Sequence, residues 1–291
     1  MTLACMRIDA HQHFWHYDAQ RDAWITDEMR VLRRDFLPEE LSRELASNGM
    51  DASVAVQADQ SENETFFLLE LAAQHSTIAG VVGWVCLTAP DVAERLARLA
   101  RFEKLRGFRH IAQSEPDDQF LLRPDFTRGI ASLRQFQFTY DILIYPRQLP
   151  AALSLVEKFP DQKFVVDHLA KPCIRMGESS SWTEYMRAMG ANPNAYCKLS
   201  GLLTEADWHH WRTDDFKPYL DVAFDAFGTD RLMFGSDWPV CLLAGSYAQV
   251  KELIVSYAQN LSVEEKDKIF GKNAARFYGL AASSHGSAAQ G

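Results

Sequence analysis

The sequence predicts an α/β fold of the (β/α)8 TIM-like barrel type, and three observations support this. Eight short apolar runs, rich in Val, Ile and Phe, recur along the chain, and a longer segment of helical character follows each of them. The chain has 291 residues, and barrels of this type usually take about 250. The main alternative, a doubly wound open sheet, would require a glycine-rich phosphate loop after an early strand, and the sequence contains neither GxGxxG nor GxxxxGKS/T.

The predicted strands occupy residues 6–10, 52–58, 78–87, 105–110, 139–145, 163–168, 195–200 and 231–235. The second and the sixth contain continuously apolar stretches, which are expected of parallel strands buried on both faces. The clearest helix follows the third strand, over 92–102, where apolar residues fall three and four positions apart. Asp91, directly after Pro90, is its expected N-cap.

These elements make one predicted domain over residues 1–280, without an internal repeat or a linker. The irregular segment 14–38 contains two tryptophans and several charged residues, and we expect it to cap one end of the barrel. Residues 281–291 are mostly Ala, Ser and Gly, a composition typical of a disordered tail.

The composition excludes several classes of protein. The net charge of −9 argues against a nucleic-acid binder and against docking on an anionic membrane. The most apolar stretch, 78–87, is far too short to span a membrane, and residues 1–7 lack the pattern of a signal peptide. The five cysteines form no CxxC pair, so reduced thiols are expected. We expect a cytoplasmic protein that acts on a small molecule, and the sequence leaves a homo-oligomer open.

Polar side chains follow three of the predicted strands at the end where barrel enzymes carry their active sites. His11 and His13 end the first strand, and residues two apart in an extended segment face the same side. His168 ends the sixth strand, and Asp237 follows the eighth. Each has an ordinary structural explanation when taken alone, such as a turn aspartate before Pro239. Together they predict a shared site, because imidazoles and a carboxylate are ligands that zinc prefers.

The other strand ends supply candidates for substrate binding. Arg109 and His110 end the fourth strand, and a guanidinium can donate several hydrogen bonds to hydroxyl or carbonyl oxygens. Tyr145, Arg147 and Gln57 hold comparable positions after other strands. Trp15, Trp24 and Trp84 could stack on the apolar face of a sugar ring, although core packing is the more common role of tryptophan.

Five short segments carry a resemblance to a known family: DAHQHFW at 9–15, LRGFRH at 105–110, VVDHLAKP at 165–172, KLSGL at 198–202 and FGSDWPV at 234–240. The chain resembles the sugar-lactonase branch of the amidohydrolase superfamily, the branch of the L-fuconolactonases and L-rhamnonolactonases, over residues 6–280. This resemblance implies a distorted (β/α)8 barrel, hydrolysis of an aldonolactone such as L-fucono- or L-rhamnonolactone, and at most one metal ion. Neither a lysine nor a histidine stands at the tip of the fifth strand, which argues against two metals.

Two mechanisms stay open at this stage. In the first, one divalent ion, zinc, is held by His11, His13, His168 and Asp237 and activates a water molecule, with Asp237 as the proton acceptor. In the second, no metal takes part, Asp237 activates water directly, and the histidines and Arg109 stabilise the oxyanion. The alternative functions are another mononuclear amidohydrolase, a non-oxidative decarboxylase of a small carboxylated substrate, and a barrel that binds sugar lactones without chemistry.

Overall fold

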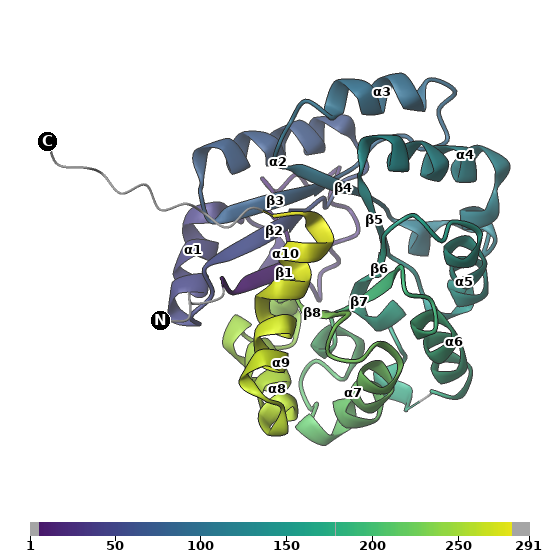
Figure 1. The fold of residues 1–291 in the computed structure, drawn as a ribbon. Coiled ribbons are helices and arrows are strands. Elements are labelled where there is room, and N and C mark those ends of the chain that lie inside the picture. Colours follow the sequence, from purple (N-terminus) through teal and green to yellow (C-terminus); the bar gives the residue numbers. More distant parts are fainter. Residues whose placement is uncertain (1–5, 178, 281–291) are drawn as a thin grey trace, which may run out of the picture.

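Eight parallel strands form one sheet in sequence order in the computed structural model, which describes residues 6–177 and 179–280 (Figure 1). The predicted barrel is therefore confirmed. The strands are β1 Ile8–Gln12, β2 Ala52–Val56, β3 Ile78–Gly83, β4 Leu105–His110, β5 Thr139–Ile142, β6 Phe164–Val166, β7 Ala195–Leu199 and β8 Leu232–Phe234. Seven fall within the predicted segments, whereas β1 starts and ends two residues later than predicted.

Helices alternate with the strands and surround the sheet (Figure 1). They are α1 Pro38–Ser47, α2 Glu62–Gln74, α3 Val92–Leu99, α4 Pro124–Leu133, α5 Leu149–Lys158, α6 Ser180–Gly190, α7 Thr213–Phe227, α8 Tyr247–Tyr257, α9 Val263–Asp267 and α10 Asn273–Tyr278. The predicted helix over 92–102 is confirmed as α3 but ends at Leu99. Asp91 is its N-cap residue by position, although the Asp91 carboxylate binds the Arg95 guanidinium at 2.9 Å rather than a backbone N–H group.

The gap between the first and the last strand is closed by two backbone hydrogen bonds. His13 N–H donates to the Trp238 carbonyl at 2.7 Å, and Asp237 N–H donates to the His11 carbonyl at 2.8 Å. Because of this pairing, the segment that follows β8 lies directly beside the end of β1. Closure of the barrel thus brings together residues more than 220 positions apart in the sequence.

The amino ends of the strands are covered by α10. The Asn273 side chain donates to the Leu232 carbonyl at the start of β8, and Phe277 packs with apolar side chains of the strands. These strand residues are Ile8, Ala10, Val54, Val56, Val82, Val165 and Met233. Because α10 packs on these apolar side chains at the amino ends, we look for the site at the carboxyl ends of the strands.

The segment 14–38 lies over those carboxyl ends. Trp15 and Phe36 exchange two backbone hydrogen bonds, and the Phe36 ring lies against that of Trp238, with ring centres 5.3 Å apart. Trp15 and Trp24 of this segment line the cavity described below. Cys86, Cys173, Cys197 and Cys241 are free thiols. No helix of the described ranges is long and apolar enough to cross a membrane, and the predicted tail 281–291 lies outside those ranges.

Candidate active site

A cavity of about 230 Å³ opens at the carboxyl ends of the strands. Its polar lining includes His13, Arg109, His168, Lys171 and Asp237, while aromatic and aliphatic side chains form the remaining walls. A larger hollow, of about 640 Å³, lies at the opposite end of the barrel and contains none of the predicted site residues. Since barrel enzymes work at the carboxyl ends of their strands, the smaller cavity is the candidate active site.

Asp9 joins the two segments that carry His11 and Asp237. Its Oδ1 accepts the backbone N–H groups of Ser236 at 2.9 Å and His11 at 3.1 Å, and its Oδ2 accepts the Tyr247 hydroxyl at 3.1 Å. Gly235 permits this approach, because a Cβ atom there would lie 2.6 Å from the His11 Cβ. The strand-end positions of the histidine pair and the aspartate are therefore fixed by a buried carboxylate between them.

His168 begins a turn of unusual backbone conformation. Four consecutive residues, His168, Leu169, Ala170 and Lys171, have φ between 51° and 56°, the left-handed region. The His168 Nδ1 lies 2.9 Å from the Ser200 hydroxyl oxygen. Gly201 makes room for the ring, since a Cβ atom there would lie 2.5 Å from the His168 Nδ1. This turn places both His168 and Lys171 at the cavity.

Three imidazole nitrogens converge on one carboxylate oxygen. The Asp237 Oδ1 lies 3.4 Å from His13 Nε2, 3.8 Å from His11 Nε2 and 3.9 Å from His168 Nε2. The Nε2 atoms of His11 and His13 are 3.1 Å apart. The four side chains proposed from the sequence as metal ligands are thus brought together, although their roles stay predictions.

Within this set, His11, His13 and Asp237 have ligand atoms that lie within 4.8 Å of one another and fit a single metal ion. His13 Nδ1 lies 2.7 Å from the Val56 carbonyl oxygen, which can only accept, so Nδ1 carries a proton and Nε2 is the nitrogen turned toward Asp237. Burial, reinforced by the Lys198 charge, holds the pKa of His11 well below its ordinary value. Burial likewise lowers the pKa of His168, against the attraction of Asp237. Neutral imidazoles beside a carboxylate are the form in which these groups bind zinc.

Asp237 is ionised in this setting. Burial opposes its charge, but His168, the hydrogen bond from His13 and the Lys171 charge outweigh burial, and the pKa of Asp237 lies below its ordinary value. An ionised carboxylate at the cavity wall can accept a proton from water. The group can therefore serve as the general base that lactone hydrolysis requires.

A closed cluster of charged side chains lies behind His11. The Lys198 ammonium of β7 lies 2.5 Å from Asp141 Oδ2, 2.9 Å from Asp167 Oδ1 and 3.0 Å from His11 Nδ1. The Tyr278 hydroxyl of α10 donates to Asp141 Oδ2 at 2.7 Å. The side chains of Lys198, Asp141 and Asp167 have no exposed surface. We call Lys198, Asp141, Asp167 and Tyr278 the buried charge cluster.

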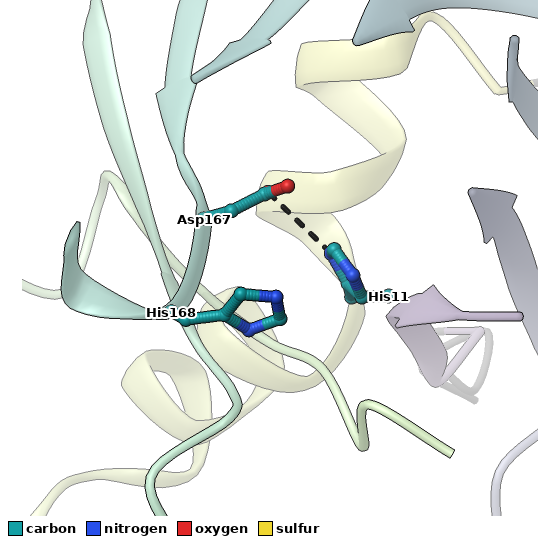
Figure 2. Close-up of side chains that lie close together, drawn as sticks. All are labelled: His11, Asp167 and His168. Atoms are coloured by element: carbon teal, nitrogen blue, oxygen red, sulfur yellow. Dashed lines mark ion pairs between the residues drawn. The ribbon is translucent and has the colours of Figure 1, made fainter. Parts of the chain in front are cut away.

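Figure 2 shows how Asp167 and His168 approach His11 from β6. The Asp167 Oδ1 lies 3.4 Å from His11 Nδ1, and these three residues form a second set of possible metal ligands. Asp167 is already paired with two cations, because Arg109 also binds its Oδ2 at 3.1 Å. Lys198, His11 and Arg109 outweigh burial and hold the pKa of Asp167 well below its ordinary value. Asp167 therefore suits the role of orienting His11 better than that of a ligand.

Several predicted substrate-binding residues do not line the cavity. His110 binds Glu115 at 2.7 Å and stacks on Phe120, and the Trp84 indole donates to His110 Nδ1 at 3.3 Å. His110 directly follows Arg109 in β4, and alternate residues of a strand point to opposite faces, so the two could not both face the barrel interior. The expectation for His110 and Trp84 thus has no support from the geometry.

Three further candidates also lie outside the cavity lining. Arg147 is bound by Asp118 and by the backbone carbonyls of Gln113 and Glu115. Tyr145 is 39% exposed, and its ring lies 5.6 Å from the Lys171 ammonium at the rim. Gln57 is fully buried and holds Arg109 from behind, its amide donating to the Arg109 carbonyl at 3.1 Å.

The sequence interpretation missed the residues of the buried charge cluster, Asp9 and the cavity position of Lys171. One signal was available, since Asp141 and Lys198 each interrupt an apolar predicted strand. A charged side chain in a strand buried on both faces requires an opposite charge nearby. That rule predicts a pairing, but it does not name the partners.

Comparisons with known proteins agree with this description. Residues 8–280 match the family model described as Amidohydrolase. The chain is 45% identical over 289 residues to an L-fucono-1,5-lactonase of Burkholderia multivorans, covering 96% of this chain and 97% of that protein. It is 38% identical to an L-fucono-1,5-lactonase of Burkholderia ambifaria, covering 94% and 95%. A crystal structure of a Burkholderia multivorans amidohydrolase with bound zinc superposes with a TM-score of 0.91 at 45% identity, covering 95% of this chain and all of that one.

Proposed function

The chain belongs to the amidohydrolase family, and from this membership we propose that it hydrolyses a sugar lactone, L-fucono-1,5-lactone or a close stereoisomer, to the sugar acid. Two lactonases that share 45% and 38% of its residues over nearly their full lengths support this activity. The resemblance noted in the five sequence segments is thereby confirmed at the level of the family.

The observation that carries the proposal is the position of the Asp237 carboxylate. It lines the cavity, is ionised, and lies within 4 Å of three imidazole nitrogens. Hydrolysis forms a bond from a water oxygen to the lactone carbonyl carbon and breaks the bond from that carbon to the ring oxygen. The water must lose a proton, and the ring oxygen must gain one. We assign both transfers to Asp237, which accepts the first proton and returns it to the departing oxygen.

Arg109 is assigned to the negative charge that develops on the carbonyl oxygen. Its guanidinium lines the cavity, while its N–H groups bind Asp167, His11 Nε2 and the Gln57 carbonyl. These contacts fix its place before any ligand enters. A donor held in place costs no reorganisation during the reaction, and removing one such donor typically lowers the rate by about 10²–10³.

The aromatic walls suit the apolar face of a sugar ring. Trp15 and Trp24 line the cavity, and their ring centres lie 6.2 Å apart in an edge arrangement. Trp15 is held by a hydrogen bond from its indole to the Arg34 carbonyl at 2.9 Å, whereas Trp24 is 44% exposed. We assign Trp15 to the fixed wall and Trp24 to the rim.

One zinc ion is the proposed metal, and the four converging side chains of His11, His13, His168 and Asp237 would hold it. When bound, the ion supplies Lewis-acid polarisation and lowers the pKa of a water molecule to about 7. The orientation of His13 Nε2 toward Asp237 and the ionised Asp237 carboxylate support this assignment.

The activity is tested by offering the purified protein L-fucono-1,5-lactone, its stereoisomers and five-membered lactones, and by following acid release with a pH indicator. Spontaneous hydrolysis is subtracted with a blank without protein. We expect turnover of the six-membered L-fucono lactone above that of its stereoisomers. Absence of turnover for every lactone, with and without added zinc, would overturn the proposal, as would carbon dioxide release from an aromatic acid in its place.

The metal is tested separately by elemental analysis before and after treatment with a chelator. We expect one zinc per chain, loss of activity on its removal, and recovery on its return. Full activity in the metal-free protein would instead assign water activation to Asp237 alone, which is the second mechanism considered from the sequence.

A further inference from the structure

Lys171 brings a second cation to the cavity, and none of the steps assigned above uses it. It ends the left-handed turn that starts at His168 and lines the same cavity as Arg109 and Asp237. Its side chain is 19% exposed, so the charge is largely shielded from water but open to a ligand in the cavity.

The two cations differ in how far their donors are occupied. Arg109 is held by Asp167, His11 and the Gln57 carbonyl. Lys171 lies 3.2 Å from Glu205 Oε1, its one ion-pair partner within 4 Å in the described part of the chain. Since an ammonium has three N–H donors, two remain for a ligand. Arg109 also keeps an N–H donor without a partner, at Nε, but Arg109 is assigned above to the carbonyl oxygen. Lys171 is therefore the cation available for a second anionic oxygen in this cavity.

The proposed reaction creates such an oxygen. A neutral lactone and water become a hydroxy acid, which releases a proton at neutral pH and leaves a carboxylate in the cavity. Asp237 places a negative charge at the same cavity, and like charges repel at short range. A carboxylate held there needs a cation on the wall, and charge-assisted hydrogen bonds are among the strong ones.

We propose that Lys171 binds the carboxylate of the sugar acid product, and that Glu205 is a positioning residue that holds the Lys171 ammonium at the cavity wall. The inference rests on the proposed lactone hydrolysis. With Lys171 in this role, the cavity binds the anionic acid in preference to neutral sugars of the same shape. The product is then a competitive inhibitor of the lactone, and its affinity falls as salt concentration rises.

The test compares the protein with its Lys171→Met variant, using L-fuconate as inhibitor and ligand. We expect the inhibition constant of L-fuconate to rise by at least about tenfold, because a charge-assisted contact is lost. The KM of the neutral lactone should rise by less than about threefold, since the lactone loses at most one hydrogen bond to an uncharged oxygen and no ion pair. An inhibition constant within twofold of the original would overturn the proposal.

Calorimetric titration keeps this result independent of turnover. L-fuconate and the neutral alcohol L-fucitol are titrated into each protein, so acid binding is measured even if no lactone is hydrolysed. Lys171→Met should lose affinity for the acid and keep that for the alcohol, whereas equal losses for both would overturn the proposal. Absence of L-fuconate binding to the unsubstituted protein would also overturn it.

Three further variants separate charge from folding. Lys171→Arg keeps a cation and should retain most of the acid affinity, while Glu205→Gln removes the ion pair and should weaken it by a few fold. Lys217→Met is the matched control, because Lys217 is exposed on α7, pairs with Asp221 one turn along the same helix and does not line the cavity. This control should bind L-fuconate as the unsubstituted protein does. Thermal unfolding followed by circular dichroism shows whether each variant is folded.

Discussion

The two nitrogens of the His11 ring face two different environments. On the Nδ1 side lies the buried charge cluster, in which Lys198 contacts both Asp141 and Asp167 and has no exposed surface. On the Nε2 side lies the cavity, where His13 and Asp237 converge and a ligand can enter. Both environments hold buried charges, but only on the Nδ1 side is every charge close to an opposite one.

The two environments therefore differ in role: the buried charge cluster holds the His11 ring in place, and the cavity side is the place where a ligand reacts. Separating paired charges that have no access to water costs several kcal/mol, so the side chains of the cluster keep their positions. Their contacts with Nδ1 therefore fix the His11 ring. The cavity side keeps a carboxylate and an ammonium whose bonding capacity is not filled. His11 is thus the point at which a rigid interior meets a site that must accept and release a ligand. The predictions below change one side at a time.

The largest effect is expected on the cavity side. Asp237→Asn should lower kcat by about 10²–10⁴-fold, because the amide cannot accept the proton from water. The fold should persist, since the Asp237 backbone N–H still closes the barrel onto His11. Steady-state rates and thermal unfolding of the same preparation check both statements, and a variant with more than a tenth of the original kcat would exclude Asp237 as the base.

On the cluster side, Lys198→Met should lower the free energy of unfolding by about 3–5 kcal/mol, because it leaves the buried Asp141 without a cation and Asp167 with Arg109 alone. Denaturant unfolding measures this loss. The double variant Lys198→Met with Asp141→Asn removes one of those carboxylates and should recover part of it. The exposed Lys217→Met variant should change stability by less than about 1 kcal/mol. Equal losses for Lys198 and Lys217 would contradict the comparison.

Glu64, outside both environments, shows what happens to a buried carboxylate without close cations. Burial raises its pKa to about 7, and the Ala58 N–H and the more remote Arg21 offset burial only in part. The folded protein therefore holds more protons than the unfolded chain between its unfolded value, near 4.5, and 7. Stability falls as pH rises through this window, and the penalty is complete above it.

Glu64→Gln should remove this pH dependence. Relative to the unsubstituted protein, the variant should gain about 2 kcal/mol of unfolding free energy between pH 4.5 and 7.5. Denaturant unfolding at a series of pH values measures the gain. Glu94→Gln, on the exposed face of α3, is the control and should show no such trend. A parallel pH dependence of the Glu64→Gln variant and the unsubstituted protein would contradict the assignment.

The smallest loss of stability is expected for Tyr278→Phe, at the edge of the buried charge cluster. Tyr278→Phe removes one hydrogen bond to Asp141, which still contacts Lys198, so the expected loss is about 0.5–1.5 kcal/mol. The kcat should stay within a few fold, because Tyr278 does not reach the cavity lining. A loss of kcat comparable to that of Asp237→Asn would show that the two sides of His11 are not separate.

Local patterns were enough to predict the barrel and the central side chains of its site. Apolar runs located the strands, and the rule that active sites lie at strand ends selected His11, His13, His168 and Asp237. Each of these is visible within its own short segment. The buried charge cluster is not, because Asp141, Asp167 and Lys198 meet only after three separate strands have paired.

Some substrate-binding expectations lack support from the geometry, because position at a strand end was used without the face to which each side chain points. Arg109 and His110 are neighbours in β4, so one faces the cavity while the other packs with Glu115 and Phe120. Lys171 lies three residues beyond the strand-end His168 and is not among the candidates that strand ends supply. The left-handed turn places Lys171 at the cavity, and nothing in the sequence His-Leu-Ala-Lys at 168–171 predicts four successive positive φ angles.

That turn also bears on how this protein could be engineered. A left-handed conformation costs roughly 1–2 kcal/mol for each residue that carries a Cβ atom. Selection for heat resistance alone would therefore favour glycine at Ala170, where the strain is released without loss of a functional side chain. The same substitution would make the backbone between His168 and Lys171 more flexible. Libraries screened only for melting temperature would therefore enrich variants of higher thermal stability and lower turnover. Screens at this turn should select for stability and turnover together.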